Sequence, residues 1–297
     1  QGDYAATDAM LGREPPATPM QGARRQLARL AFALDRGDWE AARRIAAELE
    51  AASHEHAGSS DFASWRISRM LRIAALAIDR RPDSAEARRE ALEALLDDAI
   101  LRHAQASAVT RGDTALMVLH LGYLLSREGE AAAAMRALDA TAEAVQYVSR
   151  RNLADMAAIL QARVAMGEGQ QARALALLQP RLDGGELYLT RVMAAEVRTR
   201  MGAREEALVD LAWLAERRGR AYIEWSGEGQ LMVENIIQCR LSHLRAAELL
   251  IALGKRVEAA AELAAFERAW PDLSGLDDLV ERVERLRAEL SPARNPP

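Results

Sequence analysis

Glycines that end apolar helical segments constrain this chain more than any other feature of its sequence. Five of them are followed, five residues later, by an alanine: Gly37 with Ala42, Gly129 with Ala134, Gly167 with Ala172, Gly202 with Ala207 and Gly254 with Ala259. Pro82 with Ala87 fits the same frame. Glycine stops a helix cheaply in the left-handed conformation, and a small alanine lets two antiparallel helices pack closely. The pattern predicts about six helical hairpins, which must stack because each leaves one apolar face uncovered.

The composition agrees with an all-α fold. Half of the 297 residues are hydrophobic but only 4% are aromatic, so Ala and Leu carry the apolar content, and they favour helices over strands. We expect a lead-in or linker over residues 1–21, a helical repeat domain over 22–290 and a disordered tail over 291–297. A closing helix over Leu276–Leu290 has Leu279, Val283 and Leu286 on its apolar stripe and Arg282, Arg285 and Arg287 on the other, as expected of a helix that caps the last hairpin.

Two of the predicted hairpins carry the signature positions of a known repeat. One has Leu121-Gly122, then Gly129, Ala134 and Leu138; the last has Gly254, Ala259 and Leu263, followed by Pro271. These units resemble tetratricopeptide repeats, whose period is about 34 residues, and the resemblance covers about residues 22–290. It implies an α-solenoid, a right-handed superhelical stack of antiparallel hairpins, and a function in protein–protein interaction as a scaffold or adaptor.

A second likeness lies near the C-terminus. The stretches 218–225 and 265–271 look like the ends of repeat regions attached to bacterial signalling proteins, among them nucleotide cyclases, serine/threonine kinases and winged-helix regulators. None of their catalytic or DNA-binding halves is visible in this sequence. The alternative function that this likeness implies is therefore the sensory or regulatory repeat region of a larger signalling protein.

The resemblance also implies where a protein or peptide partner would bind. In tetratricopeptide arrays the first helix of each hairpin lines a concave groove, and the register transfers that role to Arg69, Arg72, Tyr123, Arg127, Gln161, Glu196, Arg200 and Glu248. A groove that is basic at one end and acidic at the other suits a peptide of mixed charge. The alternative for each residue is an ordinary solvated helix face. Tyr222 and Trp225, in an insertion before the last hairpin, form a second candidate surface or else a local plug.

No recognisable catalytic, metal or cofactor motif occurs. His54 and His56 are two residues apart with no third ligand in view, and the pairs Gly167/Gly169 and Gly227/Gly229 lack the rest of a phosphate loop. Cys239 stands in an apolar helical segment, which predicts a buried, unreactive thiol. We therefore expect a protein that is not an enzyme and needs no cofactor or metal.

The net charge and the cysteine content indicate which kinds of partner and which cellular compartment to expect. The net charge of −5 disfavours nucleic acid, which requires a basic surface, and arginine doublets such as Arg43-Arg44 fit solvated outer faces. No apolar run is long enough to cross a membrane. A single cysteine favours the cytoplasm. Because the sequence begins with Gln1, we expect a processed product or a fragment, and the periplasm is the alternative if a signal or anchor preceded it. The sequence leaves the oligomeric state open.

Overall fold

The computed structural model describes residues 16, 18–55, 61–78, 84–224 and 231–291, and the regular secondary structure in these residues is helical. These residues contain no strand, as predicted. The elements are α2 (Pro19–Asp35), α3 (Trp39–Glu55), α4 (Phe62–Ile78), α5 (Ala85–Ala104), α6 (Arg111–Arg127), α7 (Ala131–Tyr147), α8 (Arg151–Gly167), α9 (Gln171–Leu178), a short 3-10 turn (Gln179–Arg181), α10 (Tyr188–Met201), α11 (Arg204–Glu216), α12 (Arg218–Ile223), α13 (Met232–Ala252), α14 (Arg256–Ala269) and α15 (Asp277–Leu290).

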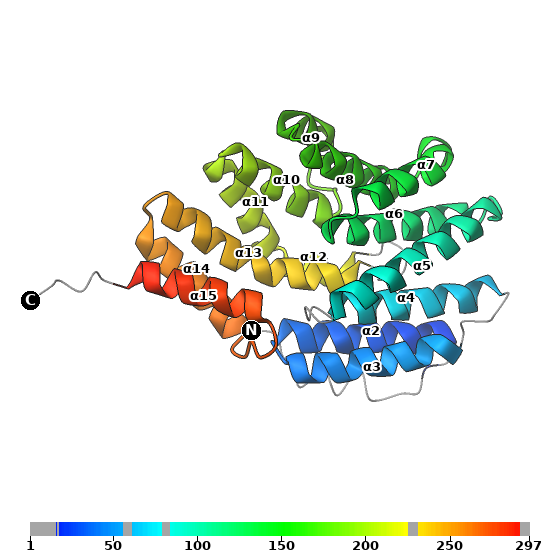
Figure 1. The fold of residues 1–297 in the computed structure, drawn as a ribbon, viewed down its shortest axis with the longest axis horizontal. Helices are drawn as coiled ribbons and strands as arrows, with labels where there is room; N and C mark the ends of the chain where they lie inside the picture. The colour runs from blue at the N-terminus through cyan, green and yellow to red at the C-terminus, as the bar shows by residue number, and fades with distance from the viewer. Residues whose placement is uncertain (1–15, 17, 56–60, 79–83, 225–230, 292–297) are drawn as a thin grey trace, which may run out of the picture.

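Neighbours in the sequence pack as neighbours in space. The closest pairs include α3 with α4, α6 with α7, α8 with α9, α10 with α11 and α13 with α14, so the helices form a repeat-like array (Figure 1). The first helix begins at Pro19, where the Thr18 side chain accepts a hydrogen bond from the backbone N–H of Gln21. That start lies before the predicted boundary at residue 22, because a threonine N-cap followed by proline is itself a helix start.

The glycine breaks are confirmed in four hairpins. Gly37, Gly129, Gly202 and Gly254 all have positive φ, between 73° and 97°. The four paired alanines are buried, as close antiparallel packing requires. The chain therefore turns where local backbone rules predict it to turn.

Two of the predicted breaks are wrong in register or position. Gly167 is the last residue of α8, and the residue in the left-handed conformation is Gly169, with φ of 74°. The inward alanine of that hairpin is consequently Ala174, while Ala172 is exposed. The Pro82 frame also fails, since Ala87 is exposed on α5; Pro82 itself lies outside the described residues.

Gly122 shows how closely two helices approach. A Cβ atom at this position would lie 2.5 Å from Cβ of Ala137 on α7 and 3.1 Å from a methyl group of Leu160 on α8. Real Cβ atoms do not approach that closely, so only glycine fits here. The Leu121-Gly122 pair thus marks the contact between α6 and its two neighbours.

The array is not an open stack. Helix α2 packs against α13, and in Figure 1 the orange and red helices α14 and α15 lie beside the blue first hairpin. The indole N–H of Trp270, at the end of α14, donates to the Leu34 carbonyl at 2.7 Å, and its ring meets Trp39 edge-on at 5.0 Å. The first and last hairpins are thereby joined, and the inner side of the array is partly enclosed.

Helices α6 and α13 form the interior of this arrangement. Buried residues occur around their whole circumference, as expected of helices enclosed by others. Cys239 of α13 is buried, as predicted. No helix in the described ranges combines the length and the apolar character that crossing a bilayer requires.

Helix α15 shows the predicted apolar stripe, with Leu279, Val283 and Leu286 buried. Its opposite stripe is not all solvated, however. Arg282 turns inward and forms two hydrogen bonds with Glu248 of α13, at 2.9 and 3.0 Å. The closing helix therefore contributes a charged side chain to the interior.

Candidate functional site

Three hollows lie on the inner side of the array and share lining residues. We call them the apolar hollow, of about 490 Å³, the passage, of about 220 Å³, and the arginine cavity, of about 500 Å³. Leu76 lines both the apolar hollow and the passage, and Arg127 lines both the passage and the arginine cavity. The three hollows therefore adjoin one another past α4, α6 and α13.

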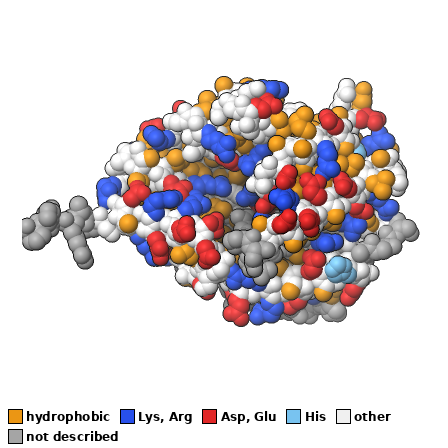
Figure 2. All heavy atoms as spheres, viewed as in Figure 1, with side chains coloured by type: hydrophobic (Ala, Val, Ile, Leu, Met, Phe, Trp, Pro, Cys, Tyr) orange, Lys and Arg blue, Asp and Glu red, His pale blue; other side chains and the backbone are white. Residues whose placement is uncertain are grey.

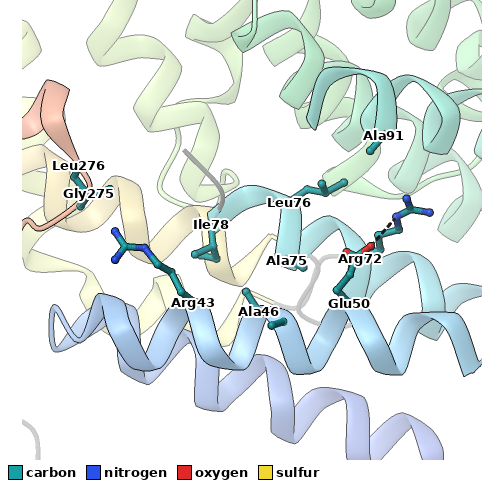
Figure 3. Close-up of a pocket in the computed structure, with 11 residues that line it drawn as sticks. Arg43, Ala46, Glu50, Arg72, Ala75, Leu76, Ile78, Ala91, Gly275 and Leu276 are labelled. Atoms are coloured by element: carbon teal, nitrogen blue, oxygen red, sulfur yellow. Dashed lines mark ion pairs between the residues drawn. The ribbon is translucent and has the colours of Figure 1, made fainter. Parts of the chain in front are cut away.

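The apolar hollow lies among α3, α4, α5 and the segment that leads into α15 (Figure 3). Its lining comes from three helices and that segment: Arg43, Ala46, Ala47, Glu50, Arg72, Ala75, Leu76, Ile78, Ala91, Gly275 and Leu276. Arg43 donates to the Ser274 carbonyl at 2.6 Å, so the expectation that Arg43 belongs to a solvated outer face is wrong. Arg72 pairs with Glu50 at 3.5 Å on the opposite rim.

The passage is the polar link between the larger hollows. Its central contact is the ion pair between Arg127 of α6 and Glu234 of α13, whose carboxylate is almost fully buried. Burial is the largest single influence on Arg127 and opposes its charged form. Glu234, Tyr123, Glu196 and Glu128 together outweigh burial, so the pKa of Arg127 is raised. Gln238 donates to the same carboxylate at 2.6 Å.

The arginine cavity carries a surplus of positive charge. Its charged lining consists of five arginines and two glutamates, an excess of three positive charges, with a wall of small and apolar side chains: Arg127, Arg163, Arg200, Arg245, Arg282, Glu196, Glu248, Ala195, Thr199, Leu211 and Leu249. Over the face drawn in Figure 2 as a whole, acidic and basic side chains are interspersed. The chain as a whole is acidic, so this local surplus is not a property of its composition.

The two glutamates of the arginine cavity are each shared by two arginines. Nη1 of Arg163 lies 3.0 Å from both oxygens of Glu196, and Arg200 reaches the same carboxylate at 3.2 Å. Glu248 accepts two hydrogen bonds from Arg282 and lies 3.9 Å from Arg285. These carboxylates are therefore already engaged.

Arg245 differs from the other arginines of the cavity. It has no hydrogen bond or ion pair to any residue that the structure describes, although it is mostly buried. Burial lowers its pKa, and the nearby Arg127 lowers it further. The cavity thus contains a cation that the fold itself leaves without an anion.

The structure brings four of the predicted groove residues together. Arg127, Glu196, Arg200 and Glu248 all line the arginine cavity. Tyr123 is buried beneath them, with the Arg127 guanidinium 5.9 Å from the centre of its ring. It supports the arginine and is not itself accessible.

The other predicted residues lie elsewhere. Arg72 lines the apolar hollow, while Arg69 is bound to Asp98 at 2.8 Å and lines none of the three hollows. Gln161 is exposed and lines none of them. Tyr222 packs against Phe32, with ring centres 5.2 Å apart, and Trp225 lies outside the described residues.

Sequence reasoning missed Glu234, Arg245 and Arg282. A signal for the first two was present, since Glu234, Gln238, Arg245 and Glu248 recur at helical spacing on one face of a helix whose other residues are mostly apolar. Polar residues on one stripe of a buried helix must meet polar partners inside the protein. Arg282 gave no such signal, because it fits the solvated stripe of α15 equally well.

No group of three or more His, Cys, Asp or Glu side chains within the described ranges is placed to hold a metal ion. His54 is exposed near the end of α3, and His56 lies outside those ranges. The chain matches no protein-family model, no curated protein and no solved structure. Its likeness to tetratricopeptide repeats is therefore one of signature residues and of helical pairing.

Proposed function

We propose that this protein is a non-catalytic binding module that holds a segment of a protein or peptide along the inner side of its helical array. The observation that carries the proposal is the row of adjoining hollows from Arg72 to Arg200. An extended chain binds well in such a line, because apolar side chains can enter the apolar hollow while polar and charged groups meet the passage.

The two ends of the line differ in chemistry. The apolar hollow is walled by alanines, Leu76, Ile78 and Leu276, with Arg43 and Arg72 at its rim. The arginine cavity is charged. A partner segment with an apolar anchor at one end and acidic groups at the other would be complementary to both, since charge complementarity fixes direction and register.

The test starts with peptides selected from a random library on the immobilised full chain. Ala47 is exposed at the apolar hollow, so Ala47→Trp would fill the hollow without disturbing the core. Ala172→Trp on α9 is the matched control, because Ala172 is equally exposed and lines none of the three hollows. We expect Ala47→Trp to weaken peptide binding at least tenfold and the control to leave it unchanged.

Equal affinity of both variants for every selected peptide would reject the inner side as the binding surface. The outer faces of the array would then replace it. Thermal unfolding of each variant shows whether it is folded at the temperature of the binding assay. A loss of binding by Ala47→Trp can therefore be distinguished from a loss of folding.

A sensory role in a larger signalling protein is the second candidate. The observation that favours it is Arg245, a buried cation in a cavity of small-molecule size. A small ligand at that position would contact α6, α8, α10, α13 and α15 together, and ligands act on an equilibrium between conformations only through such differential contacts. The sequence upstream of Gln1 in the full gene would show whether a signalling domain is attached.

A further inference from the structure

The arginine cavity contains more cationic groups than its own carboxylates can neutralise. Glu196 serves Arg163 and Arg200, Glu248 serves Arg282, and Glu234 at the edge of the passage serves Arg127. Arg245 has none of these partners. Even with Glu234 included, the charged groups at the cavity carry an excess of two positive charges.

The Arg245 side chain remains positively charged in this position. The guanidinium group stays protonated at any physiological pH and offers five N–H donors and no acceptor. A buried cation is costly unless an anion or several acceptors surround it. Arg245 is partly exposed, and the described residues supply no acceptor for it, so its acceptors come from solvent or from a ligand in the cavity.

The geometry around Arg245 limits what those molecules are. Arg127, Arg163, Arg200 and Arg282 line the same space, and several convergent guanidinium groups match the oxygens of carboxylates and phosphates. Ala195, Leu211 and Leu249 give the lining an apolar part. The volume of about 500 Å³ lies in the range of small-molecule sites, roughly 300–1,000 Å³.

We propose that the arginine cavity binds a small oxyanion with at least two negative charges, held by Arg245 with Arg163 and Arg200 beside it. The ligand carries carboxylate or phosphate groups on a compact body that fits against the Leu211 and Leu249 wall. This proposal does not rest on the peptide binding proposed above. The small ligand takes the place of the acidic groups of a partner segment in the arginine cavity, and its binding is measured without any peptide.

The decisive experiment titrates two probes into the full chain in a chloride buffer free of other multivalent anions. Citrate represents carboxylate ligands and pyrophosphate represents phosphate ligands, and calorimetry measures affinity and stoichiometry. We expect saturable one-to-one binding of at least one probe and a rise in thermal stability with its concentration. The probe that binds more tightly identifies the class of oxyanion.

Two variants of the chain locate the site. Arg245→Gln should weaken binding of the probe at least tenfold and abolish its stabilising effect. Arg287→Gln is the matched control, because Arg287 lies on α15 but is exposed and paired with Glu267 on the outside; it should bind as the parent does. Each variant removes one positive charge, so a general electrostatic effect would change both equally.

A third variant gives a result without any ligand. Arg245→Met keeps much of the length of the side chain but removes its charge, so it should unfold at a higher temperature than the parent when no multivalent anion is present. Absence of saturable binding of both probes to the folded parent would overturn the proposal. Unchanged affinity in Arg245→Gln, or a lower unfolding temperature for Arg245→Met in chloride alone, would do the same.

Discussion

Asp35 and Arg240 are 205 positions apart in the sequence, yet Nη2 of Arg240 lies 2.6 Å from Oδ1 of Asp35 and also donates to the Asp35 carbonyl oxygen at 3.0 Å. Arg218 of α12 pairs with the same buried carboxylate. One aspartate at the end of α2 thus joins the first helix of the array to two helices near its other end. Together with Trp270, it closes the array.

We expect Asp35→Asn to lower the free energy of unfolding by about 3 kcal/mol, because it leaves two partly buried arginines without their shared anion. Urea unfolding measures the loss, and hydrogen exchange shows its place: protection should fall in α2 and α13 but not in α8 and α9. Asp139→Asn, an exposed aspartate on α7, is the control. Uniform loss of protection along the chain would mean that Asp35 does not act at the closure.

Gly122→Ala should destabilise the protein by roughly 1–3 kcal/mol, because the new methyl group would overlap Ala137 and force α6 and α7 apart. Gly167→Ala provides the comparison. That glycine also lies in a helix but has no atom within 4 Å of a Cβ position, so alanine should be neutral or stabilise by up to about 1 kcal/mol. Thermal unfolding of the two variants should therefore shift in opposite directions, or at least differ clearly in size.

His120 predicts a dependence of stability on pH. Burial lowers its pKa to about 4, even though Glu234 nearby opposes the shift. The unfolded chain binds a proton near pH 6.5 that the folded chain does not accept until about pH 4, so stability is full above pH 6.5 and falls as the pH drops. Between pH 7 and pH 5 the loss should be on the order of 2 kcal/mol.

Urea unfolding at these two pH values tests that dependence, and His120→Gln should remove most of it. A smaller part should persist through His103, whose pKa burial also lowers. The carboxylate of Asp183, with a pKa lowered to about 2 by Arg151, titrates below this window and does not interfere. A parent protein equally stable at pH 7 and pH 5 would contradict the buried, neutral state of His120.

Glu234→Gln should cost about 3 kcal/mol, because Arg127 then keeps a charge in the interior without its carboxylate. The double variant Arg127→Met with Glu234→Gln should recover much of that loss, since the uncompensated cation is gone. A double-mutant cycle by chemical unfolding gives the coupling between the two side chains. Additive effects of the two substitutions would show that the ion pair contributes nothing.

The sequence predicts those parts of the fold that depend on neighbours along the chain. The turns at Gly37, Gly129, Gly202 and Gly254 follow from a rule about helix ends that needs only a glycine after an apolar helix. The error at Gly167 has the same origin. Two glycines two residues apart satisfy the rule equally well, and packing of Ala174 decides between them.

The closure and the arginine cavity could not be predicted in this way. Nothing near Asp35 indicates that its partner is Arg240, because the pairing depends on the curvature accumulated over the intervening helices. Register placed Arg127, Glu196, Arg200 and Glu248 on first helices of hairpins, and the structure gathers them in one cavity. The same register assigns Arg69 to the groove, but the structure shows that Arg69 is bound to Asp98 instead.

The contact between Trp39 and Trp270 has a consequence for how the protein is made. On the ribosome, α2 and α3 emerge well before the helices that cover Leu34 and Trp39, and at about 5–20 residues per second the delay is on the order of 10–50 s. Throughout that interval an apolar edge of the first hairpin faces the cell interior or a chaperone. During synthesis the first hairpin can therefore associate with other proteins through this edge. The exposure ends only when Trp270 has been synthesised and its indole packs on Trp39.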